Sequence, residues 1–275
     1  MIFLHYISIY LLHNILWIIF INAKETVNIS NSKIFEEELK NCEKYEDVEF
    51  LIKTNLTITH PIEVSCNNNT NIHITSSNKK IYINKNFPHL NNTDTLNQNV
   101  NPNLMINLSN AKEIKIENIG INGNIGIFEA EIVMISSIDI LGDIILNKVK
   151  NEFLIQNTHF KPNNEITNNG YIITLRESSN GIISNITFDA DVSTKQAISI
   201  YDCNDLIVKD SRFNGSLDKM KDIPNSHRVF SIYNSNRIEL NNLQIQKFGD
   251  IDSYGYNNNN NNNKYEMNIF VHLYL

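Results

Sequence analysis

The chain has 275 residues, 41% of them hydrophobic, which is enough to bury the core of one or two ordinary domains. With 9 Gly and 5 Pro, it is neither collagen-like nor a proline-rich linker. The formal net charge is −7 and Lys and Arg do not cluster, so we exclude nucleic acid as a partner, because its phosphates need a basic surface.

Residues 1–23 are predicted to be a secretory signal peptide. The segment is strongly apolar and ends at Ala23, a small residue of the kind that precedes a cleavage site. The alternative is an uncleaved signal anchor, since about 20 apolar residues can span a bilayer. We expect contact with a membrane only in that second case. Either way, the predicted location is extracellular or on the cell surface.

Secretion agrees with the presence of Asn-X-Ser/Thr sequons, although an Asn-rich chain also forms them by chance. The candidate glycosylation sites are Asn28, Asn55, Asn68, Asn91, Asn107 and Asn214. Asn185 also lies in a sequon but has a second predicted role, described below.

Three cysteines fit an oxidising compartment. Cys42 and Cys66 are predicted to form a disulfide, and Cys203 is expected to be a small buried residue. No group of cysteines and histidines has the spacing of a zinc site, so no metal site is predicted.

Residues 24–47 are predicted to form an N-terminal cap with one short helix over Ser32–Lys40. Ser32 suits the N-cap position, and Ile34, Phe35 and Leu39 form an apolar side that could cover the end of a core.

Residues 48–250 contain an internal repeat that indicates the fold. Four copies align on the polar anchors Asn118, Asn185, Asp210 and Asn242, and a fifth, less regular copy aligns on Asn157. In the four copies, large apolar residues stand twelve, ten and two positions before the anchor and three positions after it, and a small residue stands seven before. Each copy therefore holds three short alternating runs, which we call the first, second and third strand.

Strands this short cannot bury a face alone, but stacked copies can pair like strands in parallel around a shared core. The sequence therefore predicts an all-β chain folded as a right-handed parallel β-helix. The anchor suits a tight turn, because Asn and Asp tolerate unusual backbone angles. If its side chain points inward, stacked amides would form a ladder, so we predict that Asn185 is unmodified and that Asn214 is accessible.

This pattern resembles the right-handed β-helix of the pectate-lyase-like superfamily, which includes enzymes and many non-enzymatic surface proteins. The resemblance implies an architecture and not a chemistry. Lyases of this class collect several Asp around calcium, and hydrolases carry paired Asp motifs and a Gly-His-Gly; neither pattern occurs here. We therefore expect a non-enzymatic member.

In the resembled enzymes, substrate lies along the outer face of the first strand. On that face the repeat places Arg176, Tyr201 and Tyr233 in one row, as candidates for carbohydrate binding. Arg176, Glu177 and Asp202 are weak catalytic candidates, because two carboxyl groups could act as acid and base. The alternative is a ladder of exposed side chains that only stabilises the sheet.

The sequence therefore favours a secreted or surface β-helix glycoprotein with a binding, adhesive or structural role, whose partner is carbohydrate or another surface protein. The alternative is a polysaccharide lyase or glycoside hydrolase that acts on the first-strand face. No cofactor is expected, except calcium under the lyase alternative. Residues 251–275, which include the run Asn257–Asn263, are predicted to be an Asn-rich disordered tail.

Overall fold

The computed structural model describes residues 24–87, 104–161, 171–189, 196–215, 228–246, 250–254 and 267–273. The predicted signal peptide, the run Asn257–Asn263 and the candidate glycosylation site Asn91 lie outside these residues.

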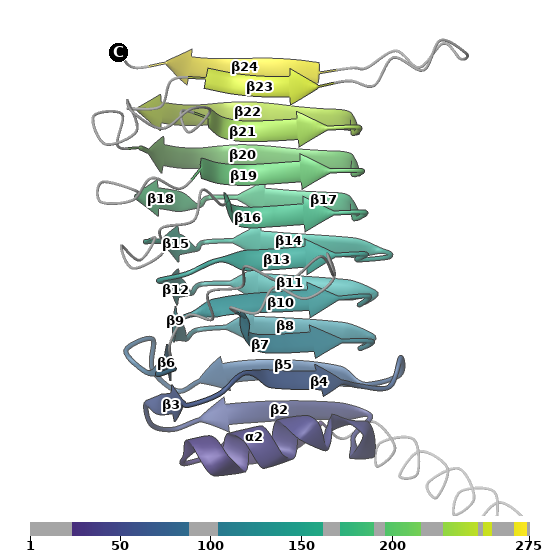
Figure 1. Ribbon diagram of the computed structural model, residues 1–275, viewed down its shortest axis with the longest axis vertical. Helices are drawn as coiled ribbons and strands as arrows, with labels where there is room; N and C mark the ends of the chain where they lie inside the picture. Colours follow the sequence, from purple (N-terminus) through teal and green to yellow (C-terminus); the bar gives the residue numbers. More distant parts are fainter. Residues whose placement is uncertain are drawn as a thin grey trace, which may run out of the picture.

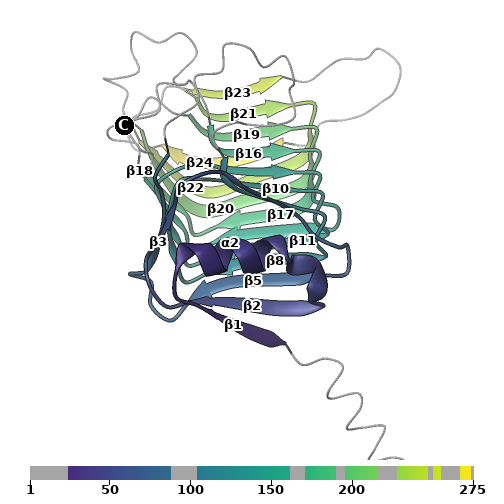
Figure 2. The same ribbon diagram turned by 60° about the horizontal axis from the view of Figure 1, so that its bottom comes forward.

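The described residues form a parallel β-helix, as predicted (Figure 1). Strands of successive coils pair in parallel throughout, and each complete coil contributes to each of three faces. Figure 2 looks toward the lower end of the stack, where one helix lies across the opening between the faces.

The first-strand face is an eight-stranded sheet. In the order of the stack its strands are β4 (Ile62–Ser65), β7 (Leu104–Ser109), β10 (Asn124–Phe128), β13 (Ile144–Asn147), β16 (Tyr171–Arg176), β19 (Gln196–Tyr201), β21 (Arg228–Tyr233) and β23 (Asp250–Tyr254).

The second and third faces are joined in one larger sheet, because β20 (Asn204–Asn214) and β22 (Asn236–Gln246) run continuously through both. The other second strands are β1 (Glu25–Ile29), β2 (Asp47–Ile52), β5 (Asn71–Ser76), β8 (Glu113–Glu117), β11 (Ile132–Ser136), β14 (Glu152–Gln156), β17 (Ser179–Ser184) and β24 (Met267–Leu273). The other third strands are β3 (Leu56–Ile58), β6 (Tyr82–Lys85), β9 (Gly120–Asn122), β12 (Asp139–Ile140), β15 (His159–Phe160) and β18 (Thr187–Asp189).

One core runs the length of the stack, because alternate residues of every face point inward. Phe160, Phe188 and Phe213 are in register on successive third strands and are almost completely buried. Fully burying one such side chain contributes roughly 1.5–3 kcal/mol. On the second strands, Gly181 leaves the space that the ring of the neighbouring Phe153 fills.

The repeat contains a coil that the Asn/Asp anchors do not reveal. Its anchor is Ser137, which adopts a left-handed backbone (φ 56°) like Asn118 and Asn157 on either side. Ile125, Ile127, Ile135 and Ile140 occupy the apolar positions of the pattern, and Ala130 occupies the small one.

The anchors adopt the predicted unusual backbone, but their side chains point outward, so the inward ladder was wrong. Asn118, Asn185, Asp210 and Asn242 have φ between 48° and 55°. Asn185 is exposed, and its Nδ2 donates to Oδ1 of Asn157 at 2.6 Å. Asn242 donates to Asp210 in the same way at 2.7 Å. A left-handed residue at a corner turns its side chain away from the core, so the amide ladder lies on the outside.

The predicted helix is α2 (Ser32–Lys40), and Phe35 and Leu39 are its buried residues. Its N-cap is Asn31 rather than Ser32: the Asn31 side chain accepts from the Ile34 amide at 3.0 Å. Ser32 Oγ instead accepts from the Thr57 amide at 2.8 Å and ties the helix to β3.

The sulfur atoms of Cys42 and Cys66 are bonded, which links the short helix η1 (Cys42–Lys44) to the end of β4. Cys203 is buried and unbonded to another cysteine. Among the described helices, none is long and apolar enough to span a membrane.

The boundaries of the solenoid are wider than predicted at both ends. Residues 25–29, assigned to the cap from sequence, form β1, which pairs with β2 in the same parallel register as later coils. Within the predicted disordered tail, β23 pairs with β21, and β24 pairs with β22. The described part of the tail therefore continues the stack.

Candidate functional site

The first-strand face brings together the predicted row of Arg176, Tyr201 and Tyr233. The three residues are in register at the ends of β16, β19 and β21. The rings of Tyr201 and Tyr233 stack, with centroids 4.9 Å apart and planes at 9°. Tyr201 is 42% exposed, and Arg176 is also exposed.

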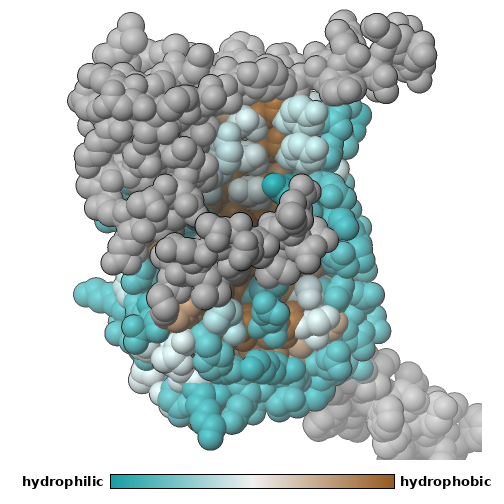
Figure 3. Space-filling view, viewed as in Figure 1, coloured by the Kyte–Doolittle hydropathy of each residue, from teal (hydrophilic) through white to brown (hydrophobic). Residues whose placement is uncertain are grey.

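A second row of small hydroxyl side chains runs beside the first. Thr174, Ser199 and Ser231 are in register two residues earlier on the same strands, and all three are half-buried. Adjacent strands lie about 4.8 Å apart, so both rows repeat at that spacing. Figure 3, which looks onto this face, shows weakly polar surface in columns over the upper strands, with apolar surface between them. The face thus offers hydroxyls, aromatic edges and one cation to a ligand.

The stacking fixes how the tyrosines can contact a ligand. Because the two ring planes lie almost parallel and are stacked along the solenoid, each ring covers one face of the other. The exposed parts are therefore mainly the ring edges and the polar tips, apart from the outer face at each end of the pair. The pair can pack beside a sugar and hydrogen-bond to it, but it offers less open ring face than two separate tyrosines would.

The two candidate carboxylates lie in the turn that follows the first strand, next to the row but outside the sheet. Glu177 and Asp202 have left-handed backbones, with φ of 47° and 54°. Asp202 accepts a hydrogen bond from the side-chain amide of Asn234, one coil further along. Among the described residues, no ion pair joins Arg176 to either carboxylate. The small residue at the same turn, Ser178, is buried, and its Oγ accepts from the Val149 amide at 3.1 Å.

No metal-binding cluster is present within the described part of the chain, as judged by groups of His, Cys, Asp and Glu. Glu177 and Asp202 are the acidic residues adjacent to the tyrosine row, and the second of them is already engaged by Asn234.

The structure separates the candidate glycosylation sites into two groups. Asn28, Asn55 and Asn68 are exposed. Asn107 is half-buried with Oδ1 enclosed, and Asn214 is half-buried at the end of β20, where Nδ2 donates to Asp189 Oδ1 at 3.2 Å. The expected contrast between a packed Asn185 and an accessible Asn214 is therefore reversed, because Asn185 lies in the outer ladder.

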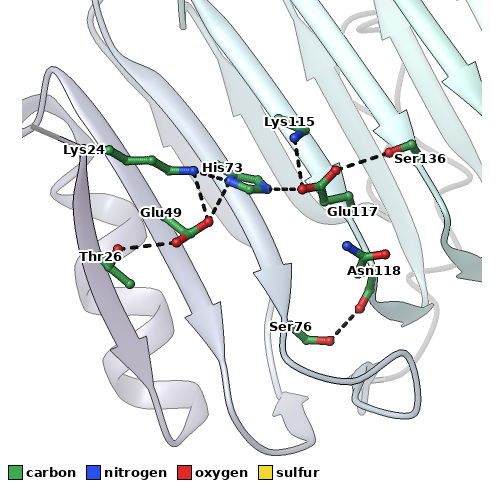
Figure 4. Close-up of polar contacts among 9 residues, drawn as sticks. All are labelled: Lys24, Thr26, Glu49, His73, Ser76, Lys115, Glu117, Asn118 and Ser136. Atoms are coloured by element: carbon green, nitrogen blue, oxygen red, sulfur yellow. Dashed lines mark hydrogen bonds and ion pairs between the residues drawn. The ribbon is translucent and has the colours of Figure 1, made fainter. Parts of the chain in front are cut away.

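A network of charges on the second-strand face was not predicted from sequence (Figure 4). His73 lies between two carboxylates, with Nδ1 2.9 Å from Glu49 and Nε2 2.9 Å from Glu117. Lys24 Nζ contacts both Glu49 (3.0 Å) and His73 Nδ1 (2.5 Å), and Lys115 bonds Glu117 at 2.9 Å.

Burial, together with the charge of Lys24, lowers the pKa of His73. Burial opposes ionisation of Glu117, but the hydrogen bond from Lys115 and the nearby cations lower its pKa overall. A neutral His73 can donate from Nε2 to Glu117 and accept at Nδ1 from Lys24, which also donates to Glu49 and so bridges the two acceptors Nδ1 and Glu49 Oε1. Every charge of the network has a partner within it, so we interpret it as a stabilising cross-strand ladder and not as a site.

No protein-family model matches the chain, and no curated protein matches it in sequence. Solved structures that match the chain in a structure search include two. One is a proposed glycosyl hydrolase from Parabacteroides merdae, with 12% identity, a TM-score of 0.43, and coverage of 81% of this chain and 98% of that one. The other is an alginate lyase from Paenibacillus sp., with 11% identity, a TM-score of 0.44, and coverage of 82% and 77%. Such distant likeness is consistent with a parallel β-helix and says nothing of chemistry.

Proposed function

We propose that the chain is a secreted or cell-surface glycoprotein whose first-strand face binds carbohydrate without cleaving it. The observation that carries this proposal is the in-register row of Arg176, Tyr201 and Tyr233, of which the first two are exposed and Tyr233 is half-buried. Tyrosine supplies an apolar ring with a polar tip, and Arg can bond a carboxylate or sulfate with two parallel hydrogen bonds. An acidic polysaccharide laid along the stack would meet both, together with the row of hydroxyls.

The arrangement of the carboxylates favours binding over catalysis. Cleavage of a glycosidic bond needs an acid and a base that both reach the same bond. Glu177 and Asp202 lie at the corner after the strand, and Asp202 is held by Asn234. The stacked tyrosines are likewise supported by each other, which suits a fixed binding surface.

A lyase or hydrolase is the second candidate, because the exposed Arg176 and Glu177 are consecutive at the end of β16. Such a pair could neutralise a uronate and remove a proton from it, with calcium as a further possible participant. The two functions differ in product, since only the enzyme shortens the polymer.

The test is to measure binding and depolymerisation with the same protein. The full secreted chain would be titrated with uronate polymers and with neutral glucans, with and without calcium, and the products examined for new reducing or unsaturated ends. We expect binding of the acidic polymers without new ends. New ends that disappear in Glu177→Gln would replace the proposal by the enzyme alternative, and failure to bind any polymer would overturn both.

Matched variants locate the site. Arg176→Ala should weaken binding to an acidic polymer about tenfold, as for loss of one charged hydrogen-bonding partner. Arg212→Ala is the control, because Arg212 is also an exposed arginine but lies on the third-strand face. Equal losses in the two variants would mean that only net charge matters and that the first-strand face is not the site.

A further inference from the structure

The outer surface of the second-strand sheet carries one continuous row of side chains, here called the central row. It runs through eight strands in register: Glu49, His73, Lys115, Met134, Leu154, Ile182, Ile207 and Glu239. The first residues belong to the charged network of Figure 4. The next four are all apolar, and the last is acidic.

The apolar stretch departs from what an outward-facing row normally holds. Outward positions of a sheet with one solvated face are usually polar. Here Met134, Leu154, Ile182 and Ile207 follow one another on adjacent strands, and Ile132 adds to them on β11. Ile182 is 36% exposed, and the others are half-buried. A contiguous apolar patch on a flat sheet is typical of a surface that meets a partner.

The charges at the two ends of the patch indicate what that partner is. Lys115, which pairs with Glu117 on its own strand, stands one strand before the patch, and Glu239, which accepts from Asn241, stands one strand after it. A twofold rotation about an axis parallel to the strands, passing between β14 and β17, brings a second copy face to face. It places Leu154 opposite Ile182, Met134 opposite Ile207, and Lys115 opposite Glu239. In this arrangement apolar residues of the central row face apolar residues of the second copy, and the cation at one end faces the anion at the other end.

The row beside it fits the same rotation. Ser136, Gln156, Ser184 and Lys209 lie two residues later on β11, β14, β17 and β20. The rotation pairs Ser136 with Lys209 and Gln156 with Ser184, so no like charges meet. The other face-to-face twofold, with its axis along the stack, would place Lys115 on Lys115 and Glu239 on Glu239. Like charges in direct contact oppose association.

We propose that two copies of this chain associate through their second-strand faces, with the stacks antiparallel. No sequon asparagine is itself a residue of the patch, and the sequon at Asn185 lies at the corner directly after Ser184. The first-strand faces lie on the other side of each core and stay open. The proposal does not depend on what those faces bind, but a dimer would present two of them.

The first test is the molar mass of the full secreted chain over a dilution series, by light scattering or sedimentation. We expect a monomer–dimer equilibrium. Ile182→Asp should shift it to monomer, because the dimer would then bury one aspartate from each copy near the centre of the interface. The control is Ser199→Asp, at a half-buried outward position of the first-strand face, which should leave the equilibrium unchanged. A circular dichroism spectrum checks that both variants are folded. A chain that stays monomeric at every concentration overturns the proposal.

The second test separates the two orientations. Lys115→Glu or Glu239→Lys alone should weaken the dimer about tenfold or more, because each places like charges opposite each other twice. The double variant Lys115→Glu with Glu239→Lys should restore it. Restoration by the double variant is specific to the antiparallel pairing. With the twofold axis along the stack, residue 115 would face residue 115 and residue 239 would face residue 239, so exchanging the two charges would change nothing. A dimer that survives both single changes, or that the double change fails to restore, contradicts the proposed geometry.

Discussion

The first-strand and second-strand faces are both built from strands that pair in parallel, coil after coil, but their outward side chains differ in chemistry. On the first-strand face, the outward rows hold hydroxyls, stacked tyrosines and an arginine. On the second-strand face, the central row is charged at its ends and apolar in the middle. Inside, both faces present the same ladder of Ile, Leu, Val and Phe. The comparison teaches that the inner rows set this fold, while each outer row is free to acquire its own partner.

The largest effect on stability is expected from changing an inward residue that lies next to an outward one. Ile183 is 1% exposed and follows Ile182 on β17. Ile183→Ala should lower the free energy of unfolding by about 2–5 kcal/mol, because it leaves a cavity in a core that cannot collapse fully. Urea denaturation measures the loss. A cost below about 1 kcal/mol would mean that the stack closes around the gap.

On the first-strand face, removal of one stacked ring should have a moderate effect. Tyr201→Ala should cost about 1 kcal/mol, since a stacked aromatic pair contributes roughly 0.5–1.5 kcal/mol beyond its buried area. A double-mutant cycle with Tyr233→Ala isolates the contact between the rings. If the two single losses simply add, the rings do not stabilise each other and the row serves binding alone.

On the second-strand face, the charged end should respond to pH. His73 is surrounded by Lys24, Glu49, Lys115 and Glu117, and its pKa is lowered below 6.5. The unfolded chain therefore binds a proton at His73 first, and stability is lost as the pH falls from about 6.5 through the folded value.

His73→Gln should remove this share of the pH dependence, as measured by thermal unfolding between pH 7 and pH 5. His159 also has a pKa lowered by burial and by Lys161, so His159→Gln serves as the comparison for a histidine outside the network. If the two profiles change equally, the effect is not particular to the network.

The smallest effect on stability should come from the apolar patch itself. Ile182→Ser, measured at a concentration where the chain is monomeric, should change the free energy of unfolding by only about 0.5 kcal/mol. A loss as large as that of Ile183→Ala would show that the central row is part of the monomer's own packing and not a surface held for a partner.

The repeat predicts the fold well because inward positions tolerate only apolar residues. It also predicts the row of Arg176, Tyr201 and Tyr233, because parallel pairing without register shifts places residues at the same position of successive copies side by side. The coil around Ser137 escapes an argument built on Asn and Asp, because serine can also adopt the left-handed turn.

Other features could not be predicted from the spacing of residues in the repeat. The turn backbone of Asn185 follows from its residue type, but whether the amide points in or out depends on the corner geometry. The strand β1 has no preceding copy in the sequence to align with, so it reads as part of a cap. The apolar patch did leave a signal: Met134, Leu154, Ile182 and Ile207 all stand three residues before an anchor, between the inward positions that drew attention first.

The stack also determines how this protein would respond to tension. β1, labelled in Figure 2, and β24, labelled in Figure 1, lie at opposite ends of the solenoid, and each coil is held only by its neighbours. A pull between the two ends acts across the ladders, so coils would open one after another and lengthen the chain in steps. The bond between Cys42 and Cys66 closes a loop that contains β2, β3 and β4 and would keep that segment from extending. A solenoid built in this way would yield gradually under load instead of failing all at once.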